Sequence, residues 1–173
     1  LSQNFFGTAV SEISRDDNGR GLWLRGRGRG AFTPTDPSMT GIKVYGEQRG
    51  AALADFNHDG RVDLCLSQNN GPTKLYVNQG AKRGLRVTLR GPVENPDAIG
   101  ARISVIYADD RQGPCRSIQA GSGYWSQDAA AQVLAFDEEP AGLRVRWPGG
   151  KEQTVHLDKG TRDVHVDPNE TWQ

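Results

Sequence analysis

Apolar and polar residues alternate along much of the second half of this chain. The alternation is strict in Leu85–Arg90, Leu143–Trp147, Thr154–Leu157 and Asp163–Val166, and approximate in Ala101–Tyr107. A period of two residues predicts β-strands that bury one face and expose the other, which would place Arg86 in solvent. Turn sequences such as Pro-Gly-Gly and Asp-Lys-Gly separate the segments. We therefore expect six or seven short antiparallel strands that form a small sandwich or barrel.

The first half contains shorter apolar runs, Gly50–Ala54 and Val62–Leu66, which also have the length of strands. The 173 residues include 22 glycines and 9 prolines against a single methionine, and no amphipathic helix stands out. Many tight connections between short strands are typical of an all-β fold. The sequence therefore predicts an all-β protein.

An acidic segment, Asp55–Asp63, separates the two runs of the first half and has the sequence Asp-Phe-Asn-His-Asp-Gly-Arg-Val-Asp. Oxygen-bearing side chains occupy its positions 1, 3, 5 and 9, and the glycine at position 6 permits a sharp turn. The backbone carbonyl of position 7 is a further oxygen donor. Ca²⁺ prefers about six to eight oxygen ligands in irregular geometry. The predicted calcium ligands are Asp55, Asn57, Asp59, the Arg61 carbonyl and Asp63.

Two other interpretations of the acidic segment fit its sequence less well. An EF-hand needs a bidentate glutamate at position 12 and flanking helices, whereas position 12 is Leu66 and the flanks have the pattern of strands. A turn rich in Asp, Asn and Gly that binds nothing is the simpler alternative. Five positions fit a cation loop and a turn needs fewer, so we expect calcium.

An internal repeat surrounds the acidic segment. Leu1–Asn4 and Leu66–Asn69 share the sequence Leu-Ser-Gln-Asn, and the strand-like Gly21–Gly26 parallels Lys74–Gly80 further along. Repeats of this kind bury their faces only by stacking. The chain is expected to open within a repeat, with further repeats upstream.

The stretches Gly50–Leu64 and Leu75–Gly80 resemble an FG-GAP or VCBS repeat. The resemblance covers about residues 1–80 and implies a four-stranded blade of a β-propeller, with a calcium-binding loop between its first two strands. One blade and part of another do not close a propeller, which typically has four to eight blades. The resemblance therefore implies partial propeller blades over residues 1–81, with more blades upstream.

The second half resembles the ASPIC/UnbV domain, which follows such repeats in secreted or surface proteins. The matching stretches are Ile99–Ile103, Ala120–Gln127 and Val145–Gly150. The sequence departs from the family pattern in the segment 128–139. The predicted organisation is a blade region over residues 1–81, an ASPIC/UnbV-like β domain over 82–168, and a tail over 169–173.

Composition excludes several function classes. Charge is balanced, with 21 basic and 21 acidic residues, which argues against nucleic acid as a partner. No apolar run approaches the ~20 residues of a membrane helix. The Arg-Gly repeat of Arg25–Gly30 is interpreted as a glycine-rich hairpin rather than a nucleic-acid segment.

Few other residues suggest chemistry. The histidines His58, His156 and His165 are expected in solvent, and whether Cys65 and Cys115 form a disulfide is left open. Four aromatic residues suggest a carbohydrate platform, but most such residues pack in a core or at an edge, which is the preferred interpretation: Trp23, Tyr124, Trp125 and Trp147.

The preferred function is a non-catalytic, calcium-stabilised binding or adhesion module that is extracellular, periplasmic or at the cell surface. Its ligand is expected to be protein or glycan. The alternative is the accessory part of a polysaccharide-acting or other hydrolase with its catalytic site upstream. A third hypothesis is a structural subunit that associates through exposed blade edges.

Overall fold

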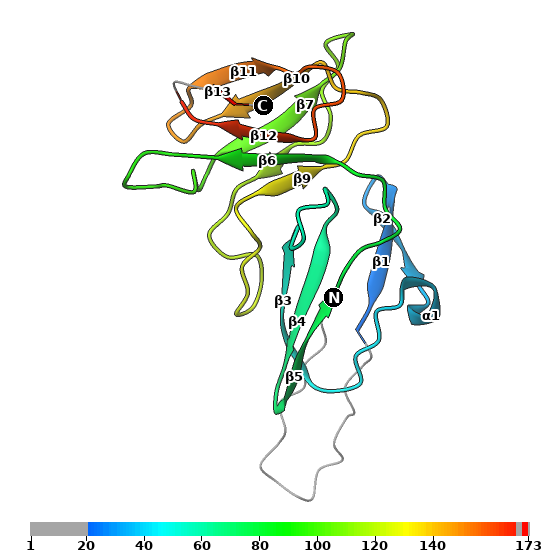
Figure 1. Ribbon diagram of the computed structural model, residues 1–173. Helices are drawn as coiled ribbons and strands as arrows, with labels where there is room; N and C mark the ends of the chain where they lie inside the picture. The colour runs from blue at the N-terminus through cyan, green and yellow to red at the C-terminus, as the bar shows by residue number, and fades with distance from the viewer. Residues whose placement is uncertain (1–20, 169–170, 173) are drawn as a thin grey trace, which may run out of the picture.

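The computed structural model describes residues 21–168 and 171–172 and is built almost entirely of β-strands (Figure 1). The all-β prediction is confirmed. The strands form two small sheets in the first half and two four-stranded sheets in the second. The Leu1–Asn4 copy of the repeat motif lies outside the described residues.

The first sheet is the hairpin of β1 (Trp23–Gly28) and β2 (Ala31–Thr35). Its two-residue turn, Arg29–Gly30, has positive φ at both positions, 50° and 76°. Such turns match the twist of paired strands. The predicted glycine-rich hairpin is therefore confirmed.

The single helix of the described chain, α1 (Pro37–Thr40), lasts one turn. The Asp36 side chain accepts a hydrogen bond from the Ser38 amide at 2.7 Å and caps its start. Gly41 ends it in the left-handed conformation, with φ 72°. No described helix is long and apolar enough to cross a membrane.

The second sheet contains β3 (Gln48–Ala54), β4 (Asp63–Gln68) and β5 (Gly71–Tyr76), paired antiparallel in that order. The acidic segment connects β3 to β4, which is where the sequence placed it. The sheet has three strands, whereas the resemblance implies a four-stranded blade. The propeller therefore stays a prediction.

The second half is a sandwich of two four-stranded sheets, drawn at the top of Figure 1. One sheet has the order β11-β10-β7-β8, and the other β13-β12-β6-β9. The strands are β6 (Leu85–Leu89), β7 (Arg102–Ile106), β8 (Arg116–Ser117), β9 (Gln132–Leu134), β10 (Gly142–Arg146), β11 (Glu152–His156), β12 (Asp163–Val166) and β13 (Thr171–Trp172).

Alternating apolar residues of both sheets form the core of the sandwich, as the pattern predicted. Leu85, Val87, Leu143, Val145 and Val164 are fully buried there. The sheets do not close into a barrel. β6 and β12 pair in parallel, a topology that alternation alone does not reveal. The boundary near residue 82 stays a prediction, and Thr171–Trp172 of the expected tail pair with β12.

Hydrogen bonds connect the sandwich to the three-stranded sheet and to the acidic segment. The Gly84 amide donates to the Gly60 carbonyl at 2.8 Å, just before β6 begins. On β3, Leu53 donates its amide to the Asp128 carboxylate at 2.8 Å and accepts from the Ala129 amide at 2.9 Å. The acidic segment therefore lies at a junction.

Candidate functional site: the acidic loop and its neighbours

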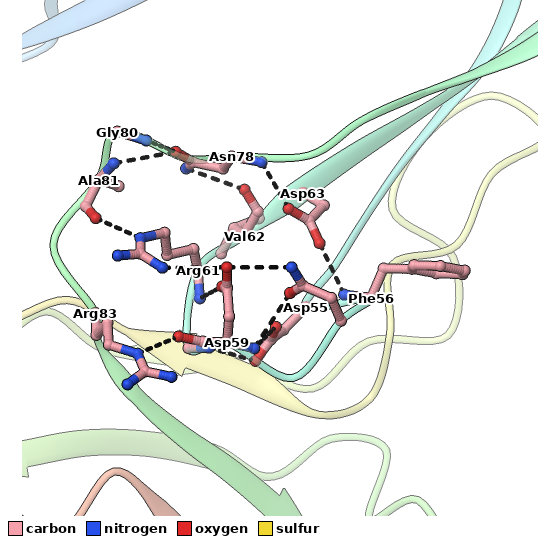
Figure 2. Close-up of polar contacts among 12 residues, drawn as sticks. Asp55, Phe56, Asp59, Arg61, Val62, Asp63, Asn78, Gly80, Ala81 and Arg83 are labelled. Atoms are coloured by element: carbon pink, nitrogen blue, oxygen red, sulfur yellow. Dashed lines mark hydrogen bonds and ion pairs between the residues drawn. The ribbon is translucent and has the colours of Figure 1, made fainter.

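The acidic loop, residues 55–62 together with Asp63 at the start of β4, folds around its own carboxylates (Figure 2). Two residues adopt left-handed backbone conformations, His58 with φ 58° and Gly60 with φ 79°. These reverse the chain so that its amides point inward. The loop therefore supplies N–H donors to the acidic side chains that open and close it.

Asp55 begins the loop and is buried. Its Oδ1 accepts the Asp59 amide at 2.9 Å, and its Oδ2 accepts the Gly60 amide at 3.0 Å. Its side chain is only 2% exposed. A buried carboxylate is costly unless hydrogen bonds or opposite charges compensate it. Both oxygens of Asp55 meet that requirement within the loop.

Asp63 closes the loop and is 2% exposed. Its Oδ2 accepts the Phe56 amide at 2.9 Å, and its Oδ1 accepts the Asn78 amide at 2.8 Å. One carboxylate thereby ties the start of the loop to the chain that follows β5. Hydrogen bonds to charged acceptors contribute about 1.5–3 kcal/mol each to stability, so we expect Asp63 to stabilise this part of the fold strongly.

Asp59 and Asn57 lie nearer the surface. The Asn57 Nδ2 donates to Asp59 Oδ2 at 3.2 Å, and Arg61 donates its amide and its guanidinium to the same carboxylate at 2.9 and 3.1 Å. Partial desolvation raises the pKa of Asp59, but these hydrogen bonds and the Arg61 charge lower it more. The pKa therefore lies below its ordinary value, and Asp59 stays ionised at neutral pH.

Sequence reasoning missed Asn78, which stabilises the other side of the loop. Its Oδ1 accepts the amides of Gly80 and Ala81 at 3.2 and 3.1 Å, and its Nδ2 donates to the Val62 carbonyl at 3.2 Å. The sequence Asn78-Gln79-Gly80 was a usable signal, because an asparagine side chain often accepts a hydrogen bond from the backbone two residues further on.

Sequence reasoning also missed Arg83 and Arg86, which link the loop to the sandwich. The Arg83 Nε donates to the Asp59 carbonyl at 2.6 Å. The Arg86 Nε lies 3.8 Å from Asp55 Oδ2, and the Arg86 side chain is only 15% exposed. The expectation that Arg86 faces solvent was wrong, because the acidic loop packs over that position.

The oxygen donors of the loop are of the kind that calcium prefers. The arrangement of these donors suits a calcium ion only in part. The predicted ligands Asp55, Asn57, Asp59, Arg61 and Asp63 all lie on the one loop. Among residues 21–168 and 171–172, however, no group of three or more acidic, histidine or cysteine side chains is placed to hold a metal ion. Loop amides and the Arg61 guanidinium bind the carboxylates instead, so calcium binding stays a prediction.

The remaining candidates lie elsewhere. His58, His156 and His165 are exposed, as expected. Both cysteines are free, with Cys65 half-buried in β4 and Cys115 exposed.

The four aromatic residues do not form one platform. Trp147 is buried and donates its Nε1 proton to Gln153 at 2.9 Å, whereas Tyr124 and Trp125 lie together at the surface.

Comparison with known proteins supports the interpretation of the second half. The family model described as ASPIC and UnbV matches residues 91–171. Cartilage acidic protein 1 of Xenopus tropicalis is 34% identical over 109 residues, which cover 61% of this chain and 17% of the relative. The mouse and human proteins of that name are 36% and 35% identical over 80 residues.

These matches cover a minor part of the relatives: 17% of the Xenopus protein and 12% of the mouse and human proteins. They show shared ancestry without assigning the role of the whole relative to this chain. The resemblance to the ASPIC/UnbV domain is confirmed, and the FG-GAP/VCBS resemblance stays a prediction. The chain contains an ASPIC/UnbV domain and is homologous to cartilage acidic protein 1 over part of its length.

Proposed function

We propose that this chain is a non-catalytic extracellular or cell-surface binding module, stabilised by calcium in the acidic loop. The observation that carries the proposal is the position of the loop, whose buried carboxylates lie where the three-stranded sheet meets the sandwich. A loop at that place affects how firmly two parts of the chain are joined. The proposed role of the loop is therefore structural.

In this proposal Asp55, Asn57, Asp59, Asp63 and the Arg61 carbonyl hold the ion. When bound, Ca²⁺ supplies positive charge and fixed coordination to the carboxylates. Each carboxylate oxygen has two lone pairs, so an oxygen that accepts a loop amide retains capacity for a cation. Asp59 has to exchange the Arg61 guanidinium for the ion, which is a modest cost at a partly exposed pair.

The extracellular location fits both the metal and the relatives. The names of the relatives refer to cartilage. Calcium sites of extracellular modules commonly have dissociation constants of about 10⁻⁴–10⁻³ M. A site of that class is useful where calcium is abundant, so weak binding is compatible with the proposed role.

Thermal unfolding with calcium, with magnesium and with a chelator tests the proposal. A ligand present at about a hundred times its dissociation constant stabilises the folded state by roughly 2.7 kcal/mol. We expect the melting temperature to rise with calcium and to fall back with the chelator, and magnesium to act weakly because it demands octahedral geometry. An unchanged melting temperature at calcium concentrations far above 10⁻³ M would refute calcium stabilisation.

A further inference from the structure

Arg49, Tyr124 and Trp125, here called the aromatic patch, form one exposed surface from two distant parts of the sequence. The two rings stack with centroids 5.8 Å apart and planes inclined by 22°. The Arg49 guanidinium carbon lies 4.8 Å from the Trp125 centroid and 5.5 Å from the Tyr124 centroid. Even with this contact, Tyr124 is 55% exposed and Trp125 is 76% exposed.

Trp125 is unfavourable for stability at its position. Its φ is 51°, in the left-handed region where a bulky side chain is a clear outlier. Its exposure shows that little burial offsets the strained backbone. Strained residues that persist in a fold cluster at functional sites. An exposed tryptophan with a strained backbone is therefore a candidate for contact with a ligand.

The turn that carries the two rings is held firmly in place. The Ser122 amide donates to the Ser126 carbonyl at 3.0 Å, and the turn packs against β3 at Gly50. A Cβ at Gly50 would lie 2.9 Å from the Trp125 carbonyl oxygen, so only glycine permits this approach. A rigid aromatic platform binds with less loss of conformational entropy than a mobile one.

A polar cavity of about 300 Å³ adjoins this turn and shares Ser122 with it. Its walls carry hydroxyl, amide and guanidinium groups, from Ser117, Ser122, Gln119, Gln132 and Arg116. Hydroxyls and amides both donate and accept hydrogen bonds, which suits the hydroxyl groups of a sugar. The carboxylate of Asp128, also at the wall, is engaged with the Leu53 amide.

We propose that the aromatic patch and the polar cavity bind an acidic glycan, with a sugar ring on the Tyr124–Trp125 surface. Arginine binds carboxylates through directed, charge-assisted hydrogen bonds, and Arg49 and Arg116 lie on the two parts of the site. The inference rests on the proposed function as a binding module. It names the ligand class and the surface, and it does not depend on the metal.

NMR titration of the full chain with a hexamer of galacturonic acid, in the presence of chelator, tests the proposal. The probe is compared with the same hexamer after methyl esterification, which removes the charge and keeps the sugar. We expect saturable binding, a shift of the Trp125 indole signal, and at least fivefold weaker binding of the ester. Equal binding of the two probes, or no binding of the acid, would overturn the proposal.

Trp125→Gly is the informative variant because glycine tolerates the left-handed backbone. We expect its melting temperature to be no lower than that of the unmodified chain and its affinity for the acidic hexamer to fall at least tenfold. Phe32→Ala, at an exposed aromatic residue of β2 outside both parts of the site, should leave the affinity unchanged. Equal losses in both variants, or none in Trp125→Gly, would overturn the assignment. A calcium-dependent melting temperature with no glycan binding would refute this inference alone.

Discussion

The Nε of Arg86, on the first strand of the sandwich, lies 3.8 Å from Oδ2 of Asp55 in the acidic loop. The same guanidinium donates through a terminal nitrogen to Asp163 on β12 at 3.2 Å. Within the part of the chain that the structure describes, the buried Nε has no hydrogen-bond partner of its own. Arg86 thus connects the acidic loop to two sandwich strands, β6 and β12. A change in the charge of the loop therefore alters the electrostatic interactions of Arg86 at the junction.

Asp63→Asn is expected to destabilise the fold by about 2 kcal/mol. Asp63 accepts amides with both carboxylate oxygens, and an asparagine would direct an N–H group at one of those donors. Urea unfolding in the presence of chelator measures the loss without any contribution from metal. Asp110→Asn is the matched control, at an exposed turn with positive φ that asparagine tolerates. Equal stability of the two variants would contradict the role assigned to Asp63.

Arg61→Ala is expected to strengthen calcium binding by about two- to fivefold, because the guanidinium no longer competes for Asp59. The variant also loses the hydrogen bond to the Ala81 carbonyl, so its metal-free melting temperature should fall. Calorimetric titration and thermal unfolding measure the two effects. Arg111→Ala is the control, since Arg111 pairs with Asp109 at the same spacing but outside the loop. Weaker calcium binding by Arg61→Ala would count against this competition.

Gly50→Ala is expected to cost roughly 1–3 kcal/mol, because the new methyl group meets the Trp125 carbonyl oxygen. The contact also holds the turn of the aromatic patch on β3, so binding at the patch should weaken as well. Gly26→Ala makes the same change on β1, where no atom lies within 4 Å of the new Cβ. Chemical denaturation of both variants provides the comparison, and a neutral Gly50→Ala would show that this contact is unimportant.

Glu139 gives the fold a predictable response to acid. The hydrogen bond from Arg162 at 2.6 Å is the largest effect and lowers the pKa of Glu139 below its ordinary 4.5. Desolvation opposes this lowering, and the hydrogen bond from the Gly160 amide at 3.0 Å adds to it. A lowered folded-state pKa contributes stability above pH 4.5, which is lost as the pH falls through the folded-state value. Glu139→Gln should therefore be less stable than the unmodified chain at pH 7 and approach it in acid.

Urea unfolding at a series of pH values from neutral to acidic measures this response. Glu94→Gln, at an exposed carboxylate, should keep the pH dependence of the unmodified chain. A Glu139→Gln variant with the same acid sensitivity as the unmodified chain would show that other groups govern it.

Local patterns predicted much of this molecule. Alternation in Leu85–Leu89 and Leu143–Trp147 identified the sandwich strands and their buried faces, because side-chain direction in a strand depends only on position. Spacing placed the Asp55–Asp63 loop between two strands. Asp59 and Arg61 were correctly assigned to that loop, although the sequence did not indicate that they pair with each other.

Long-range relations were not predictable in the same way. Arg86 has the pattern of a solvent-facing residue, and only the packing of the acidic loop against β6 makes it a partner of Asp55. The stacking of Arg49 on Tyr124 and Trp125 joins residues about 75 positions apart. The parallel pairing of β6 with β12 has the same character, since alternation determines a face and leaves the neighbour undetermined.

Isothermal titration calorimetry, with calcium added to the chain after treatment with chelator, tests the central claim most directly. We predict one saturable site with a dissociation constant of about 10⁻⁴–10⁻³ M. Asp59→Asn should weaken it at least tenfold, because Asp59 lies near the surface and its loss spares the buried carboxylates. No saturable binding at calcium concentrations far above 10⁻³ M, or unchanged binding by Asp59→Asn, would contradict the claim that the acidic loop is a calcium site.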